Sequence, residues 1–220
     1  RRAQREGFAN RVAILDFDVH HGNGTEDIFK DDDTVLTASI HAAPLFPGTG
    51  FESSETSINY PIQARSPLKN NSEWISGIEY LINKIIEFDP DLILVEAGVD
   101  ASEFDWSSEL GITNTTFEYT GKRVSSLANL LGIPVVAEIG GGYTEESFSE
   151  GFKCLLEGSF KPTGSSLVPP ENPPEIIFPE GFIKSVSESF DILYSNDYYL
   201  YDVYPYTYYI GQYPLKDVNL

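Results

Sequence analysis

Two carboxylates and two imidazoles lie within six residues of one another, from Asp16 to His21, directly after an apolar segment. That segment, residues 11–15, has the composition of a strand buried in a parallel sheet. Alternate side chains of a strand share a face, so Asp16, Asp18 and His20 would point the same way if the extended geometry continues. Oxygen and imidazole ligands that converge suit zinc or another divalent ion. The spacing therefore predicts a metal site, and the alternative is a capped strand end with solvated carboxylates.

The rest of the chain alternates expected strands with expected helices, which is typical of an α/β domain with a mainly parallel sheet flanked by helices. Strands are expected at residues 11–15, 35–40, 92–97 and 134–139, with a short extended piece at 58–60. Helices are expected at residues 25–29 with Thr25 as N-cap, from an Asn70/Glu73 capping box to the Asp89-Pro90 stop, at 117–130 before Gly132, and at 145–157 with Thr144 as cap.

Other residues that can do chemistry also follow expected strands. His41 ends one strand, Asp100 follows another, and Tyr143 comes after three glycines that follow the last strand. Ligands bind at the carboxyl ends of the strands in such sheets, so we expect these side chains to share one site with Asp16–His20. Asp100 could instead cap the next segment, and Tyr143 could simply pack after a turn.

The composition indicates one folded domain with an appendage in 220 residues. Its 41% hydrophobic content supports a core, and no apolar run is long enough to span a membrane. The formal net charge of −20 argues against binding nucleic acid, and it fits a cationic substrate or simply an acidic surface. The single cysteine, Cys154, excludes an internal disulfide. We therefore expect a cytoplasmic protein, or a nuclear one if the source is eukaryotic.

The last quarter of the chain differs in composition from the rest. Residues 161–183 hold six prolines, and residues 190–213 hold nine of the thirteen tyrosines. We expect a catalytic-type domain at residues 1–160, followed by a Pro-rich linker and a Tyr-rich tail at 161–220 whose role the sequence leaves open. The tail would form a pair of strands on the domain surface, or alternatively an aromatic interaction patch.

Four motifs of the chain occur in the order found in one enzyme family. They are Asp16–Gly24 (Asp-Phe-Asp-Val-His-His-Gly-Asn-Gly), His41 with Phe46–Gly50, Ala97–Asp100, and Gly140–Tyr143. Over residues 11–158 the chain resembles the histone deacetylase and acetylpolyamine amidohydrolase family of the arginase-deacetylase superfamily. Asn23 and the Pro44–Phe46 loop resemble class II-like and bacterial members. The resemblance implies an arginase/deacetylase-like fold, and substrates that are acetylated lysine peptides, acetylpolyamines or small acylated amines.

By resemblance, Asp18, His20 and Asp100 would bind one catalytic zinc ion and leave room for water and substrate. The zinc would polarise the acetamide carbonyl. Tyr143 would donate a hydrogen bond to the oxyanion that develops there.

The resemblance also assigns residues around the zinc. Phe46, unless it is an ordinary core residue, and Gly142 would line the substrate channel, while His21, Asn23 and His41 would support the site structurally. A structural potassium ion would be held by the side chains or backbone oxygens of Asp16, Asp18, His20, Ser39 and Ile40. A second such ion would be held by backbone oxygens around Phe29, Asp32 and Val35.

The chain departs from the family's pattern at the general base. Family members activate water with a tandem histidine pair upstream of the first motif, whereas this sequence has three histidines, all placed above. The sequence has no Met and reaches its first expected strand early, so we expect an N-terminally truncated fragment with little or no activity alone. Three alternatives stay open: a natural, catalytically weak relative, a metal-stabilised protein that binds acylated ligands without cleaving them, and a two-manganese ureohydrolase. The oligomeric state stays open too.

Overall fold

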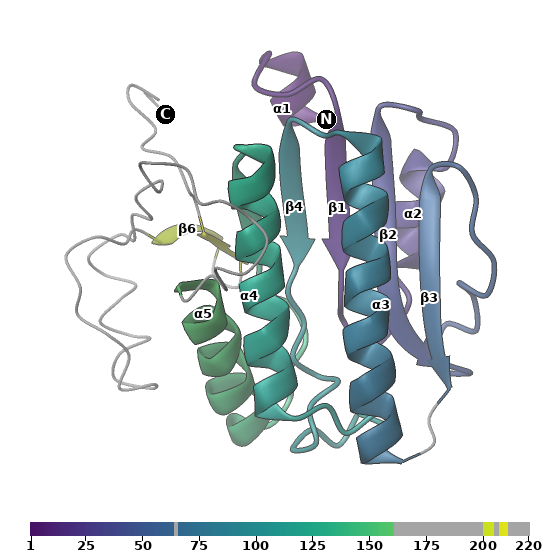
Figure 1. The fold of residues 1–220 in the computed structure, drawn as a ribbon, viewed down its shortest axis with the longest axis vertical. Helices are drawn as coiled ribbons and strands as arrows, with labels where there is room; N and C mark the ends of the chain where they lie inside the picture. Colours follow the sequence, from purple (N-terminus) through teal and green to yellow (C-terminus); the bar gives the residue numbers. More distant parts are fainter. Residues whose placement is uncertain (64–65, 161–199, 205–206, 211–220) are drawn as a thin grey trace.

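A five-stranded parallel sheet forms the centre of the molecule (Figure 1). The computed structural model describes residues 1–63 and 66–160, and the backbone of two strands at 200–204 and 207–210. The sheet has the order β3-β2-β1-β4-β5, and its four pairings are all parallel. Its strands are β1 (Val12–Asp16), β2 (Val35–Ala43), β3 (Ser57–Gln63), β4 (Leu92–Glu96) and β5 (Val135–Glu138). The expected α/β class with a parallel sheet is thereby confirmed.

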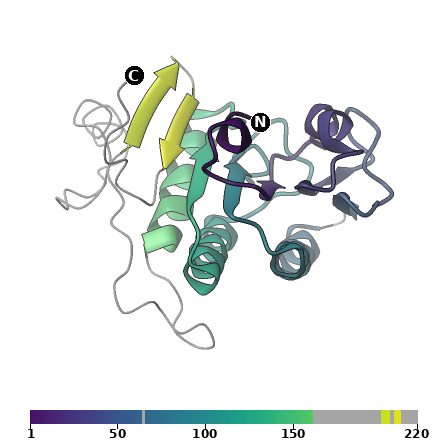
Figure 2. The same ribbon diagram turned by 90° about the horizontal axis from the view of Figure 1, so that it is seen from above.

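Helices lie on both faces of this sheet, as Figure 2 shows. The long helices α3 (Pro67–Phe88) and α4 (Asn114–Leu131) cover one face together with α5 (Phe152–Phe160). The short helices α1 (Arg2–Arg5) and α2 (Asn23–Phe29) lie on the other face, and a π-helical turn, η1 (Ser147–Gly151), leads into α5. None of the described helices is both long enough and apolar enough to cross a membrane.

The main core lies between the sheet and α3, α4 and α5. Trp74 and Phe117, one from each long helix, are fully buried there with their ring centroids 6.2 Å apart. Alternate residues of β1, such as Ala13 and Leu15, face the same core. Since all five strands run in one direction, the loops at their carboxyl ends meet along one edge of the sheet. For β1, β2, β4 and β5 those loops are residues 17–22, 44–56, 97–113 and 139–146.

Several expected boundaries were wrong. The second strand does not stop at His41 but runs to Ala43, because β3 pairs with it over that whole length. Helix α2 begins at Asn23 after Gly22, so Thr25 is inside the helix and is not its cap. Helix α3 begins at Pro67, so Asn70 is inside it as well, where its side-chain amide donates to the Leu110 carbonyl oxygen at 2.8 Å.

Other boundaries were confirmed. Asp89 ends α3 with a left-handed backbone (φ 53°), and Gly132 ends α4 in the same way (φ 66°). The Thr144 hydroxyl accepts a hydrogen bond from the Ser147 amide at 3.0 Å, as expected of a cap. In the tail, β6 (Leu200–Tyr204) and β7 (Thr207–Ile210) form an antiparallel pair. The expected linker at 161–183 lies outside the described residues.

Candidate metal centre

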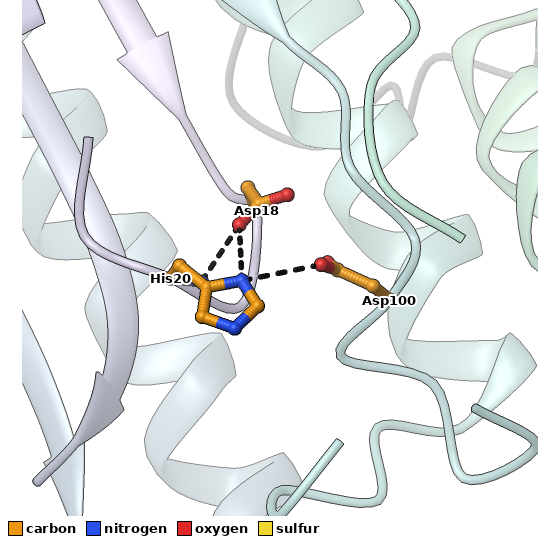
Figure 3. A group of neighbouring side chains, drawn as sticks. All are labelled: Asp18, His20 and Asp100. Carbon is orange, nitrogen blue, oxygen red and sulfur yellow. Dashed lines mark hydrogen bonds and ion pairs between the residues drawn. The ribbon is translucent and has the colours of Figure 1, made fainter. Parts of the chain in front are cut away.

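Asp18, His20 and Asp100 bring three ligand atoms together at the carboxyl edge of the sheet (Figure 3). Asp18 and His20 follow β1 and Asp100 follows β4, two strands that are neighbours in the sheet. The Nδ1 atom of His20 lies 3.1 Å from Asp18 Oδ1 and 3.5 Å from Asp100 Oδ2. The three expected zinc ligands are therefore one group in space, although eighty residues separate His20 from Asp100.

Backbone hydrogen bonds hold the two aspartates in this arrangement. Asp18 Oδ1 accepts from the His20 amide at 2.7 Å, and Asp100 Oδ1 accepts from the Val19 amide at 2.9 Å. Asp16 Oδ1 in turn accepts from the Asp18 amide at 3.1 Å. One carboxylate oxygen of Asp100 is thus committed to fixing the loop, and Oδ2 is left to face His20.

The electrostatics of the group favour a cation. Asp100 is fully buried, and its Oδ2 atom has no hydrogen-bond partner. Burial, and then the negative charge of Asp18, raise the pKa of Asp100 to about 8. Ligand atoms around a tetrahedral zinc ion are about 3.3 Å apart, because each bond is about 2.0–2.1 Å long. The two distances from His20 Nδ1 lie on either side of that value, so this donor set fits zinc.

Gly98 and Gly141 have no side chains that would occupy the space next to Asp18 and Asp100. A Cβ atom added at Gly98 would lie 2.7 Å from the Cα atom of Asp18. One added at Gly141 would lie 2.6 Å from Asp18 Oδ2 and 2.9 Å from the carboxyl carbon of Asp100. Gly141 also has a positive φ of 66°, which side chains rarely adopt. Residues with side chains at these positions would push the ligands apart.

Tyr143, the expected oxyanion donor, follows the glycine loop, which passes Asp18 and Asp100 at Gly141. Its pKa is raised by burial first and then by the negative charges of Asp100, Asp18 and Asp105. A phenol that senses these carboxylates lies within their electrostatic reach, and it stays protonated at neutral pH. The side chain is 56% exposed, so the hydroxyl can reach a ligand that enters from solvent.

Asp105 joins the Tyr143 loop to the loop that carries Asp100, a role that no sequence pattern indicated. Its Oδ2 atom accepts from the Tyr143 amide and from the Ser147 hydroxyl, each at 2.6 Å. Its Oδ1 atom accepts from the amide and the hydroxyl of Ser107, at 2.9 and 2.6 Å. Both oxygens of one buried carboxylate are thus used to join two loops.

Of the two residues expected in the channel, Phe46 is 77% exposed, so its alternative assignment to the core is wrong. Its ring meets the His20 ring edge-on, with centroids 6.3 Å apart. Gly142 has a φ of 110°, and a Cβ atom there would lie 2.8 Å from a methyl group of Val99. Phe46 therefore borders the ligand group, whereas Gly142 packs against Val99, the residue before Asp100.

The other two histidines belong to a separate network. His21 lies 2.8 Å from the Thr49 hydroxyl through Nδ1 and 3.1 Å from Glu26 through Nε2. His41 is fully buried between the Ser39 hydroxyl, 3.0 Å away, and the Gly50 carbonyl oxygen, 3.1 Å away. Burial, followed by the nearby His21, lowers the pKa of His41 to about 4, so it is neutral. The backbone amide of Asn23 donates to the His21 carbonyl oxygen at 2.8 Å. The supporting role expected of His21, Asn23 and His41 stays a prediction.

The two expected monovalent-cation sites stay predictions, and the structure shows where their residues lie. Asp16 and Ser39 are paired positions of β1 and β2 and line one small pocket, and Ile40 follows Ser39 along β2. Burial and the charge of Asp18 raise the pKa of Asp16 well above its usual value. At the second location, the Phe29 carbonyl oxygen accepts from the Asp32 amide and the Asp32 carbonyl oxygen accepts from the Val35 amide. The Asp32 carboxylate there pairs with Arg1.

The fold and these ligands define the class: an α/β protein with an Asp-His-Asp group at the carboxyl ends of neighbouring parallel strands. Within that class, residues 1–158 match the histone deacetylase domain, so the chain belongs to that family. It is 35% identical over 171 residues to the chloroplastic histone deacetylase 14 of Arabidopsis thaliana. That match covers 71% of this chain and 39% of the plant protein. It is 33% identical over 160 residues to acetylpolyamine amidohydrolase 1 of Pseudomonas aeruginosa, covering 68% and 44%.

The fold agrees with that assignment. The crystal structure of an acetylpolyamine aminohydrolase from Burkholderia pseudomallei superposes with a TM-score of 0.63 and 28% sequence identity. The match covers 71% of this chain and 47% of that one. The chain thus spans less than half the length of these relatives.

Proposed function

We propose that these residues form the zinc-binding part of a deacetylase that hydrolyses acetylated amines, either lysine side chains or polyamines. The observation that carries the proposal is the convergence of Asp18, His20 and Asp100, with Tyr143 two residues after Gly141, which packs against Asp18 and Asp100. Relatives named histone deacetylase and acetylpolyamine amidohydrolase support both substrate classes. A structural potassium ion beside Asp16 and Ser39 is part of the same proposal.

Each residue then has a chemical task. Asp18, His20 and Asp100 would hold one zinc ion, which supplies Lewis acidity toward the acetamide carbonyl and lowers the pKa of water. Tyr143 would donate its O–H to the carbonyl oxygen as negative charge develops there, a hydrogen bond worth about 2.7–4 kcal/mol in comparable sites. Phe46 would exclude water from the alkyl stem of the amine.

None of the three histidines, all of which lie in the described part of the chain, is placed to act as the general base. Of the three histidines, His20 belongs to the ligand group, and His21 and His41 are both engaged in the network around Thr49 and Ser39. A base must reach the attacking water by a hydrogen bond. We therefore propose that this polypeptide alone binds acetylated amines but turns them over slowly or not at all. The same observation favours ligand binding without cleavage as the second candidate function.

The metal content tests the first part of the proposal. Titration of the metal-free chain with zinc, followed by elemental analysis, should give one zinc ion per chain. Asp100→Asn should lose that ion because it removes an anionic ligand while keeping the shape of the side chain. Glu109→Gln, at an exposed position of the same loop, should retain it. Two manganese ions per chain, or zinc binding that Asp100→Asn leaves intact, would contradict the proposal.

A turnover assay tests the second part. The zinc-loaded chain should release little or no acetate from an acetyl-lysine peptide or from N-acetylputrescine. Rapid release that Asp100→Asn abolishes would confirm the deacetylase and overturn the statement about the missing base.

A further inference from the structure

Trp106 is an exposed indole next to the candidate catalytic tyrosine, and nothing described so far uses it. Its side chain is 77% exposed, and its ring centroid lies 5.8 Å from that of Tyr143 at a tilt of 42°. Burial of so large an apolar ring is favourable, yet in this structure the ring stays open to solvent. The ring is therefore a surface available to a ligand at the edge of the metal centre.

The position of Trp106 is fixed by its neighbours on both sides in sequence. Asp105 binds the Tyr143 amide, and Ser107 donates twice to the same carboxylate. The peptide units that flank the indole are thus held against the Tyr143 loop. A ring that is anchored through its backbone loses little conformational freedom when a ligand binds, which favours recognition.

A second exposed aromatic ring lies on another side of the ligand group. Phe46 approaches the His20 ring, while Trp106 approaches Tyr143. The two rings come from different loops, 44–56 and 97–113, at the same edge of the sheet. Two exposed aromatic rings thus lie on loops at the edge of the sheet that carries the candidate metal centre.

Four of the loops at this edge of the sheet carry charge of one sign. The four loops at the carboxyl ends of β1, β2, β4 and β5 contain no lysine and no arginine. They contain nine acidic residues: Asp18, Glu52, Glu55, Asp100, Glu103, Asp105, Glu109, Glu145 and Glu146. Such a field attracts cations and repels anions. Among aromatic side chains, tryptophan binds a cation most strongly over its ring face.

We propose that Trp106 is a specificity-determining residue that binds a protonated amine of the ligand over its indole face, just outside the metal centre. This inference rests on the proposed function and names its substrate class: an acetylated amine that carries a second, positively charged nitrogen, such as an acetylated diamine or polyamine. An acetyl-lysine peptide, whose backbone at that point is uncharged, gains less from the indole.

Two ligands that differ in this charge test the proposal. N-acetylputrescine carries an ammonium group, and N-butylacetamide has the same amide and a similar chain without it. Their dissociation constants with the zinc-loaded 220-residue chain can be measured by ligand-observed NMR in 0.5 M NaCl, where the field of the loop acids is screened. The wild type should bind N-acetylputrescine about 3- to 10-fold more tightly, as expected for a cation over an aromatic face.

Variants at position 106 separate the indole from the general charge. Trp106→Leu keeps an apolar side chain and should bind both ligands equally, whereas Trp106→Phe should keep part of the preference. The intrinsic fluorescence gives a second readout, because the other tryptophan, Trp74, is fully buried. N-acetylputrescine should change the emission of the wild type and leave that of Trp106→Leu unaltered.

The outcomes distinguish this inference from the proposed function. Equal binding of the two ligands by the wild type, a preference that survives in Trp106→Leu, or no detectable binding of N-acetylputrescine would each overturn the role of Trp106. Binding of both ligands that is insensitive to zinc removal would overturn the proposed function instead, whatever happens at position 106.

Discussion

At the scale of single residues, the site contains two buried carboxylates, Asp100 and Asp105, that have different roles. Asp100 faces His20 with an oxygen that has no hydrogen-bond partner, whereas both oxygens of Asp105 are satisfied by donors. The first arrangement calls for a cation, and the second holds two loops together. Both residues are aspartates. The hydrogen-bond donors that the fold supplies make Asp105 a structural anchor, and their absence around Asp100 Oδ2 makes Asp100 a candidate ligand.

Asp105→Asn should therefore destabilise the protein. The amide would present N–H groups to at least one pair of donors, and a buried donor left unsatisfied costs about 1–3 kcal/mol. We expect the free energy of unfolding in urea at pH 7 to fall by about that amount. Glu109→Gln, an exposed acid of the same loop, should change it by no more than about 0.5 kcal/mol.

The difference in unfolding free energy between the wild type and Asp105→Asn should depend on pH. Burial acts to raise the pKa of Asp105, but the hydrogen bonds from Ser107, Ser147 and Tyr143 outweigh it and lower the pKa below its usual value. A carboxyl group with a lowered pKa contributes stability above its unfolded pKa of about 3.9 and loses it as the pH falls through the folded value. The stability difference between wild type and Asp105→Asn should thus shrink below about pH 4. A difference that is unchanged there would mean that Asp105 is not bound as an anion.

At the scale of elements, the helices α4 and α5 cross so closely that glycine is required at the crossing. A Cβ atom at Gly121 would overlap the Leu155 carbonyl oxygen, and one at Gly158 would overlap the Glu118 carbonyl oxygen. Both contacts are with backbone, which cannot move aside as a flexible side chain could. The crossing in turn places η1 and the loop before it, and that loop carries Tyr143.

Gly121→Ala should consequently lower the free energy of unfolding by about 2 kcal/mol or more, although alanine favours helices. Overpacking of this kind costs about 1–3 kcal/mol, and more when backbone is in the way. Gly24, inside α2, is the matched control because a Cβ atom there would meet nothing within 4 Å. Gly24→Ala should raise the stability by about 0.5–1 kcal/mol in the same urea experiment. If Gly121→Ala and Gly24→Ala were both stabilising, that result would contradict the close contact between α4 and α5.

The sequence predicted the elements that follow local rules, and it missed those that depend on distant contacts. Asp89 and Gly132 were readable as helix ends because a left-handed backbone conformation is a local property. Asn70 was misread as a cap, since its true partner, the Leu110 carbonyl oxygen, lies forty residues away. The roles of Asp105 and Trp106 were missed for the same reason: each depends on Tyr143, which no periodicity links to that loop.

At the scale of the whole molecule, the candidate metal ligands come from the ends of two strands that lie side by side only in the folded chain. Asp18 and His20 follow β1, and Asp100 follows β4, with α3 between these strands in sequence. A metal ion bound by all three stabilises the folded state alone, because the unfolded chain does not hold the ligands together. The net charge of −20 adds repulsion that a bound cation reduces locally.

Zinc should therefore raise the thermal stability of the chain, and a chelator should reverse the effect. At a free zinc concentration one hundred times the dissociation constant, the gain is about 2.7 kcal/mol, or roughly 5–10 °C in Tm for a domain of this size. Asp100→Asn should show no shift with zinc. Without zinc it should be at least as stable as the wild type, because it removes a buried carboxyl group whose pKa is raised to about 8 by burial and by Asp18. An equal zinc shift in wild type and Asp100→Asn would place the ion elsewhere and would remove the basis for the metal centre.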